Sequence, residues 1–127
     1  MRLDWRAWLG LPHEIGADPR DGSAACCLVM TTIILQDKGF NTPPIDDWLV
    51  AAKAGNYAEI LYQLEKCIEP ITTPEMYAFT IFRNGRSGLG VGIVIESNTL
   101  LLVHHRKGVI TLPLDRLRLM RYNRLRQ

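Results

Sequence analysis

The stretch DGSAACCLVMTTIIL, residues 21–35, decides how this chain folds. After Ser23 its residues are apolar nearly all round, and a helix of that kind has to be buried on every side. Asp21 or Ser23 is a suitable N-cap, and Gly39 is suited to close the C-terminus. An irregular loop rich in Pro and Gly, residues 12–22, precedes the helix. The sequence therefore predicts a buried central helix against which the rest of the chain packs.

Cys26 and Cys27 stand next to each other at the front of this helix. A cysteine at a helix N-terminus can have its thiol pKa lowered and act as a nucleophile. Free cysteine is also among the most buried residue types, and it packs like a small hydrophobe. Both interpretations stay open at this point, and packing is the commoner role of such residues.

The whole chain has the size and composition of one domain. It has 127 residues, of which 47% are hydrophobic and 22% charged, close to the averages for soluble globular proteins. Its three cysteines are an odd number and two are adjacent, so a disulfide framework is not expected. We expect a single domain over residues 1–127 that folds in a reducing cytoplasm.

Charged residues interrupt the beginning of the chain at Arg2, Asp4 and Arg6, so we expect neither a secretion signal nor a membrane span. The formal net charge is only +2, although arginines accumulate after His105. No aromatic stacking platform or recognition helix accompanies them, so nucleic acid is not the expected partner. A solvated or partner-docking basic edge is the plainer interpretation.

Helical patterns fill the first half of the chain. Residues 5–9 have helical spacing, and a second helix is expected from Pro44 to a stop at Gly55. A third helix should follow an Asn56 cap that has Glu59 three residues on, and it should end before Pro70.

The second half of the chain changes to β-strand patterns. Short runs rich in Val, Ile, Leu and aromatic residues predict about five strands, at residues 76–82, 92–96, 99–104, 109–112 and 117–122. Gly85, Gly88 and Gly90 are expected in a hairpin loop, because a strand follows them where a phosphate-binding loop would need a helix. The prediction is an α+β fold with N-terminal helices and a buried central helix packed on a C-terminal antiparallel sheet.

This order of elements resembles the NlpC-type cell-wall cysteine peptidases, which share a papain-like fold. The matching segments are GSAACCLV at residues 22–29, GVGIVI at 90–95 and LVHH at 102–105, within a resemblance that covers about residues 17–114. In that family an Asp-Cys pair opens the central helix, a His heads the strand, and a third polar residue lies on the next strand. The last strands resemble those of the short NlpC-like proteins encoded among bacteriophage tail genes.

The resemblance implies that the catalytic motifs are degenerate. The nucleophile position falls on Ala25 in one register and on Cys26 in the other. Gly90 stands where the family has its general base, and glycine cannot accept a proton. His104 matches the third polar residue, which orients the base. If the chain were active, Cys26 and His104 would be the catalytic pair.

From the resemblance we expect a structural or assembly component of a bacteriophage tail, near the tip or hub, made in the host cytoplasm and assembled into the virion. Other tail proteins are the expected partners, and copies could assemble around the tail axis. The alternative is an active cysteine endopeptidase that cleaves the stem peptides of peptidoglycan. No C-x-x-C or H-x-x-x-H spacing supports a metal site, and no cofactor is expected.

Overall fold

The chain is an α+β protein, as the sequence predicts. The computed structural model describes residues 3–84, 88–96, 98–116 and 121–127. In these residues three α-helices come before all the strands: α1 (Cys27–Asp37), α2 (Asp46–Lys53) and α3 (Tyr57–Glu65). Three short 3₁₀ helices complete the helical part: η1 (Trp5–Trp8), η2 (Pro19–Asp21) and η3 (Leu114–Arg116).

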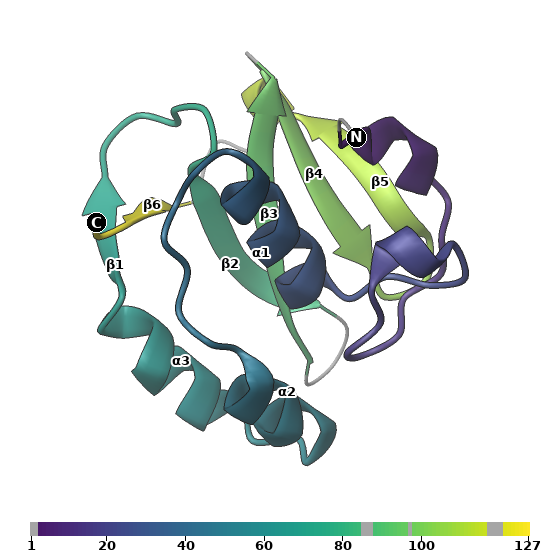
Figure 1. The fold of residues 1–127 in the computed structure, drawn as a ribbon. Helices are drawn as coiled ribbons and strands as arrows, with labels where there is room; N and C mark the ends of the chain where they lie inside the picture. The colour runs from purple at the N-terminus through teal and green to yellow at the C-terminus, as the bar shows by residue number, and fades with distance from the viewer. Residues whose placement is uncertain (1–2, 85–87, 97, 117–120) are drawn as a thin grey trace.

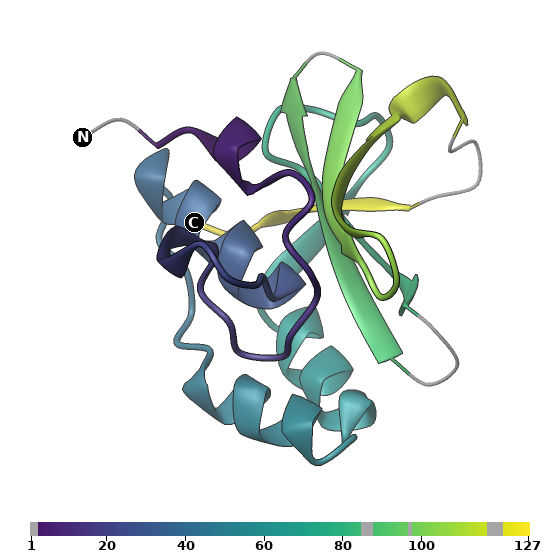
Figure 2. The same ribbon diagram turned by 90° about the vertical axis from the view of Figure 1, so that its right-hand side faces the viewer.

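The strands form one sheet in the order β1-β6-β2-β3-β4-β5, and every neighbouring pair is antiparallel. Helix α1 lies across the face of the sheet in Figure 1, and Figure 2 shows all three α-helices on the same side of it. The described strands are β1 (Ile68–Ile71), β2 (Phe79–Asn84), β3 (Gly88–Glu96), β4 (Thr99–His104), β5 (Gly108–Pro113) and β6 (Tyr122–Leu125).

The N-terminal loop holds the residues before α1 in an extended conformation. Ala25 donates its backbone N–H to the carbonyl of Pro12 at 2.9 Å and accepts from the N–H of Glu14 at 3.0 Å. Cys26 donates its N–H to the carbonyl of Ala17 at 3.0 Å. These two residues are therefore tied to the loop before the helix can include them.

As a consequence α1 begins later than the sequence predicts. Its first residue is Cys27 and its N-cap is Cys26, so neither Asp21 nor Ser23 caps it. Its end agrees with the prediction, because Gly39 takes a φ of +88° just beyond the helix.

The other two α-helices differ little from expectation. Helix α2 begins at Asp46, two residues after Pro44. Helix α3 begins after Asn56, whose side-chain oxygen accepts from the N–H of Glu59 at 3.4 Å, so the predicted cap is confirmed. The short helix expected near the N-terminus is the 3₁₀ turn η1.

Strand β1 is missing from the sequence-based prediction. The sequence predicts that Pro70 ends a helix. In the structure α3 already ends at Glu65, and Pro70 lies inside β1. Proline is tolerated there because β1 is an edge strand with β6 on one side, so the missing N–H costs no ladder hydrogen bond.

Strand β3 is longer than predicted, since it begins at Gly88, within the expected loop, and Gly90 pairs with Phe82 of β2. The expected strand at residues 117–122 falls largely outside the described residues, and β6 begins only at Tyr122.

The two faces of the sheet bury separate apolar clusters. The first lies under α1 and includes Met30, Ile34 and Ile93, none of which is more than 2% exposed. The second lies on the opposite face and consists of Ala78, Val94, Leu100, Leu102 and Tyr122. Side chains of a strand alternate between the two faces of the sheet, so successive side chains of β3 point alternately toward the two clusters.

Gly108 and Gly55 make a matched pair for testing the contact between β5 and the N-terminal loop. Both have left-handed backbones, with φ of +75° and +76°, but a Cβ on Gly108 would lie 2.1 Å from the oxygen of Leu11, whereas Gly55 has nothing within 4 Å. We expect Gly55→Ala to lower the free energy of unfolding by about 1–2 kcal/mol. Gly108→Ala should lower it by about 1–3 kcal/mol more because of the clash. Urea denaturation measures both, and equal losses would contradict the contact.

Candidate functional site

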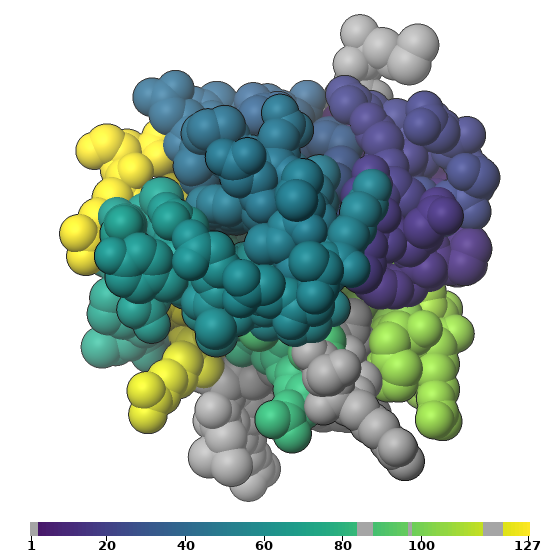
Figure 3. Space-filling model, turned by 90° about the horizontal axis from the view of Figure 1, so that it is seen from below, coloured from purple at the N-terminus to yellow at the C-terminus, as the bar shows by residue number. Residues whose placement is uncertain are grey.

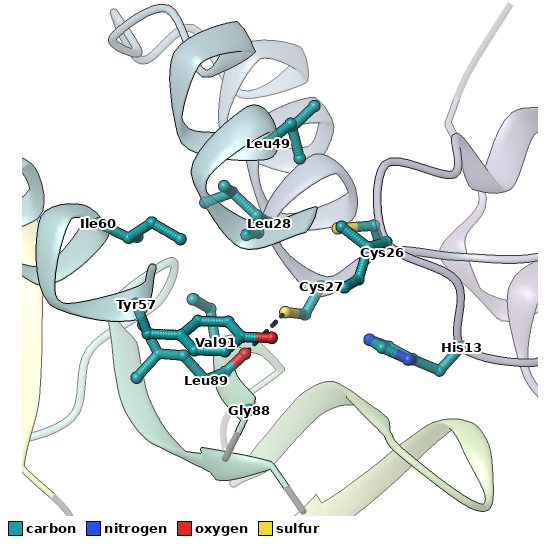
Figure 4. Close-up of a pocket in the computed structure, with 12 residues that line it drawn as sticks. His13, Cys26, Cys27, Leu28, Leu49, Tyr57, Ile60, Gly88, Leu89 and Val91 are labelled. Carbon is teal, nitrogen blue, oxygen red and sulfur yellow. Dashed lines mark hydrogen bonds between the residues drawn. The ribbon is translucent and has the colours of Figure 1, made fainter. Parts of the chain in front are cut away.

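A small cavity lies where the beginning of α1 meets the N-terminal loop, α2, α3 and β3. Its volume is about 50 Å³. Figure 3 shows α2 and α3 over this end of the molecule, next to the N-terminal segment. Figure 4 shows the lining side chains, which are His13, Ile15, Cys26, Cys27, Leu28, Leu49, Ala52, Tyr57, Ile60, Gly88, Leu89 and Val91.

Cys27 points its sulfur into this cavity, toward β3 (Figure 4). The sulfur lies 3.9 Å from the carbonyl oxygen of Leu89, and the residue is only 5% exposed. The pKa of the Cys27 thiol is well above its ordinary value, first because the thiol donates a hydrogen bond to Cys26, then because it is buried and close to the charge on Cys26. The raised pKa favours the protonated form of Cys27, whose sulfur has the carbonyl oxygen of Leu89 within reach.

Cys26 is the residue at which negative charge can reside. The pKa of its thiol is lowered far below the ordinary value, chiefly because Cys27 donates a hydrogen bond to its sulfur. Burial opposes this effect, while the backbone N–H groups of Val29, Gly16 and Leu28 add to it. Of the two neighbouring thiols, Cys26 is therefore the one that loses its proton first.

His13 is the histidine that lines the cavity. The N-terminal loop places it there, because His13 forms a β-bridge with Ala25, immediately before the cysteines. Figure 4 shows its ring directed into the cavity on the side of Cys27, with Tyr57 of α3 on the other side. The sequence offers no signal for either residue: His13 is an isolated histidine in a loop, and Tyr57 is one of several aromatic residues in helical segments.

His104 lies elsewhere, as the last residue of β4, just before the turn to β5. Its Nδ1 accepts from the backbone N–H groups of Arg106 at 3.0 Å and Lys107 at 3.1 Å, and its ring stacks on His105 at 4.5 Å. Partial burial, followed by the charges of His105, Lys107 and Arg106, lowers the pKa of His104. Cys26 is thus placed in a cavity with Cys27 and His13, and the residues that line this cavity do not include His104.

Gly90 does not face the thiols. Leu89 and Val91 belong to the cluster under α1, so the residue between them points to the other face of the sheet. A Cβ on Gly90 would lie 2.5 Å from the ring of Phe82, which packs on that opposite face. The β3 residue opposite the Cys27 thiol is Leu89, and Ala25, the other nucleophile candidate, is fully buried.

The geometry limits what this cavity can do. Pockets that bind small ligands have volumes of about 300–1,000 Å³, several times larger than this one. Among the described residues no three His, Cys, Asp or Glu side chains are arranged so that they could hold a metal ion. The cavity therefore fits a buried pair of thiols better than a site that admits a peptide.

Comparison with protein-family models gives no match, and no curated protein is significantly similar to the chain. In the part of the chain that the structure describes, each helix is too short or too polar to cross a bilayer.

The hydrogen bond between the two cysteines can be tested by following thiolate absorbance in the ultraviolet against pH. We expect the folded protein to contain one thiolate that titrates well below the ordinary range, and Cys26→Ala should abolish this titration. Cys27→Ala should raise the pKa of Cys26, because it removes the largest cause of its lowering. Cys67→Ala, on a thiol whose hydrogen bond goes to Gln63, is the matched control and should leave the titration unchanged. A titration that survives in Cys26→Ala would refute the assignment.

Proposed function

We propose that this chain is a catalytically inactive relative of the NlpC-type cysteine peptidases and serves as a structural component of a bacteriophage tail. The order of its motifs supports the family, and the observed packing of a buried helix on an antiparallel sheet agrees with a papain-like arrangement. The observation that carries the inactive state is the burial of both thiols, 4% exposed at Cys26 and 5% at Cys27, in a cavity of about 50 Å³.

Thiol catalysis of peptide cleavage needs a thiolate that touches the substrate carbonyl and an imidazole within hydrogen-bond reach of the sulfur. Here the apolar residue Leu89 faces the Cys27 thiol from the sheet, and its carbonyl oxygen lies within reach of the sulfur. Four side chains of α2 and α3 help to line the cavity, Leu49, Ala52, Tyr57 and Ile60, and the space that remains is too small for a peptide. Such a site would retain the arrangement of a peptidase site but would not admit a peptide substrate.

The tail role is supported by the resemblance of the closing segments, GVI at residues 108–110 and PL at 113–114, to the short NlpC-like proteins of phage tails. In such a role the surface, not the cavity, makes the functional contacts. Other tail proteins are the proposed partners, and copies of the chain around the tail axis are part of the same proposal.

An active cysteine endopeptidase acting on peptidoglycan stem peptides remains the second candidate. One observation favours it: the thiol of lowered pKa at Cys26 and the imidazole of His13 line the same cavity. In this reading His13, not His104, would be the base.

An assay on purified peptidoglycan separates the two candidates. We expect the wild-type chain to release no new amino groups from cell-wall fragments, and Cys26→Ala and His13→Ala to behave in the same way. Cleavage that requires a reduced thiol, disappears in Cys26→Ala and persists in Cys67→Ala would establish the peptidase instead.

The tail role is tested on particles produced in cells that express the gene during infection. Mass spectrometry of purified virions and of isolated tails should find the chain in both at a constant ratio to the other tail proteins. Absence of the chain from purified particles would contradict a structural role.

A further inference from the structure

A larger groove lies at the opposite end of α1 from the cysteines. It has a volume of about 510 Å³, within the range of about 300–1,000 Å³ typical of small-ligand sites. It is bounded by η1, the C-terminal end of α1 and the end of β3, which meet at the upper side of the molecule in Figure 2. Ile34 and Ile95, only 2% and 6% exposed, form its buried base.

Two aromatic side chains, Trp5 and Tyr77, line this groove. Among the described residues Tyr77 is the only non-glycine with a positive φ, +64°, a conformation that is strained for a bulky side chain. Its N–H donates to the carbonyl of Val94 at 2.8 Å, and its ring packs edge-on against Phe40 at 6.1 Å, so the surroundings hold it in place. Strain of this kind is concentrated at ligand-binding and other functional positions.

The charged side chains of the groove are paired. Arg6 forms an ion pair with Glu96 and lies 4.0 Å from Asp4, and the Nζ of Lys38 lies 3.7 Å from Asp37. Because each cation has a carboxylate beside it, the groove carries no strong unbalanced charge that would select a small ion. These side chains remain 35–66% exposed, so their remaining donors and acceptors are open to a ligand.

The cations are also placed next to the rings. The guanidinium of Arg6 lies 4.6 Å from the centre of the Trp5 ring, and the Nζ of Lys38 lies 6.0 Å from that of Tyr77. A ligand in contact with either ring would therefore lie close to the hydrogen-bond donor that is placed over that ring.

The backbone of this region offers little to a peptide. Strand β3 is paired with β4 as far as Glu96, and with β2 only as far as Ile93. Beyond Ile93, the backbone of Val94 is bonded to Tyr77 and Ala78, so little of the strand is open to an added chain. The N–H of Tyr77 is already bound to Val94. A ligand in the groove therefore has to be recognised by side chains. These side chains supply aromatic rings, hydrogen-bond donors and hydrogen-bond acceptors.

We propose that this groove binds an oligosaccharide. A sugar ring has an apolar C–H face that can pack on an aromatic ring, and hydroxyl groups around its edge that both donate and accept hydrogen bonds. The rings of Trp5 and Tyr77 meet the first requirement. The carboxylates accept from hydroxyl groups and the guanidinium of Arg6 donates to them, as charge-assisted hydrogen bonds. The inference rests on the groove alone and does not depend on the proposed family or on the state of the cysteines.

NMR titration of the full-length ¹⁵N-labelled chain with chitotriose, and separately with maltotriose, tests the proposal. We expect at least one of the two sugars to give a saturable shift of the Trp5 indole signal, identified by its loss in Trp5→Phe, with a dissociation constant in the millimolar range or tighter. The indole of Trp48, which lies in the core away from the groove, should not move.

Tyr77→Gly is the decisive variant, because glycine adopts a φ of +64° without strain, so the change removes the ring while relieving the backbone. Binding should weaken by about tenfold, and the ¹⁵N spectrum should show that the protein remains folded. Tyr62→Ala is the matched control: Tyr62 is 57% exposed and has Lys66 over its ring at 4.2 Å, but it lies on α3 outside the groove. This variant should bind like the wild type.

The proposal fails if neither sugar gives a saturable shift, or if Tyr77→Gly binds as tightly as the wild type. It also fails if N-acetyl-trialanine amide, an uncharged peptide, saturates the Trp5 signal at a lower concentration than either sugar.

Discussion

The pairing of the N-terminal loop with the two residues before α1 is the constraint on which the candidate site depends. Backbone hydrogen bonds of Ala25 and Cys26 to this loop fix the point at which the helix can begin. They also bring His13 beside the cysteines and direct the Cys27 sulfur toward β3. Without this pairing the apolar run after Ser23 would start its helix earlier, and a different pair of side chains would line the cavity.

The alternation of side chains along β3 is the second constraint. It assigns Leu89 and Val91 to the face under α1 and Gly90 to the opposite face. A family motif compared by sequence position alone therefore does not say which side chain meets the thiol, since a shift of one residue moves a side chain to the other face. Here the Cys27 thiol meets the backbone carbonyl of Leu89, an apolar residue of the cluster under α1.

Much of the fold could be predicted from the sequence because local signals agreed with the tertiary structure. The burial of α1, its end at Gly39 and the Asn56 cap follow from patterns within a few residues. Strand β1 could not be predicted, because Pro70 is a strong helix breaker and only its pairing with β6, more than 50 residues away, makes it part of a strand.

Of the candidate site, Cys26 at the head of the buried helix was predictable from helix signals, whereas its neighbours were not. His13 reaches the cavity through a bridge to Ala25 across the N-terminal loop, and Tyr57 reaches it through the packing of α3. His104, the histidine that the motif order favours, accepts two backbone N–H groups in a turn. Contacts of this kind depend on how loops close, which a single sequence does not encode in any local pattern.

The two edge strands of the sheet limit how this chain can associate with other chains. At one border Gly10 and Leu11 pair with Val109 of β5, and that strand finishes at Pro113, which has no N–H; at the other border β1 contains Pro70. Neither edge of the sheet can therefore readily form β-sheet hydrogen bonds with a strand of another chain. Association of copies edge to edge into continuous fibres is thereby disfavoured, and any contact between copies has to use the relief and charge of their surfaces.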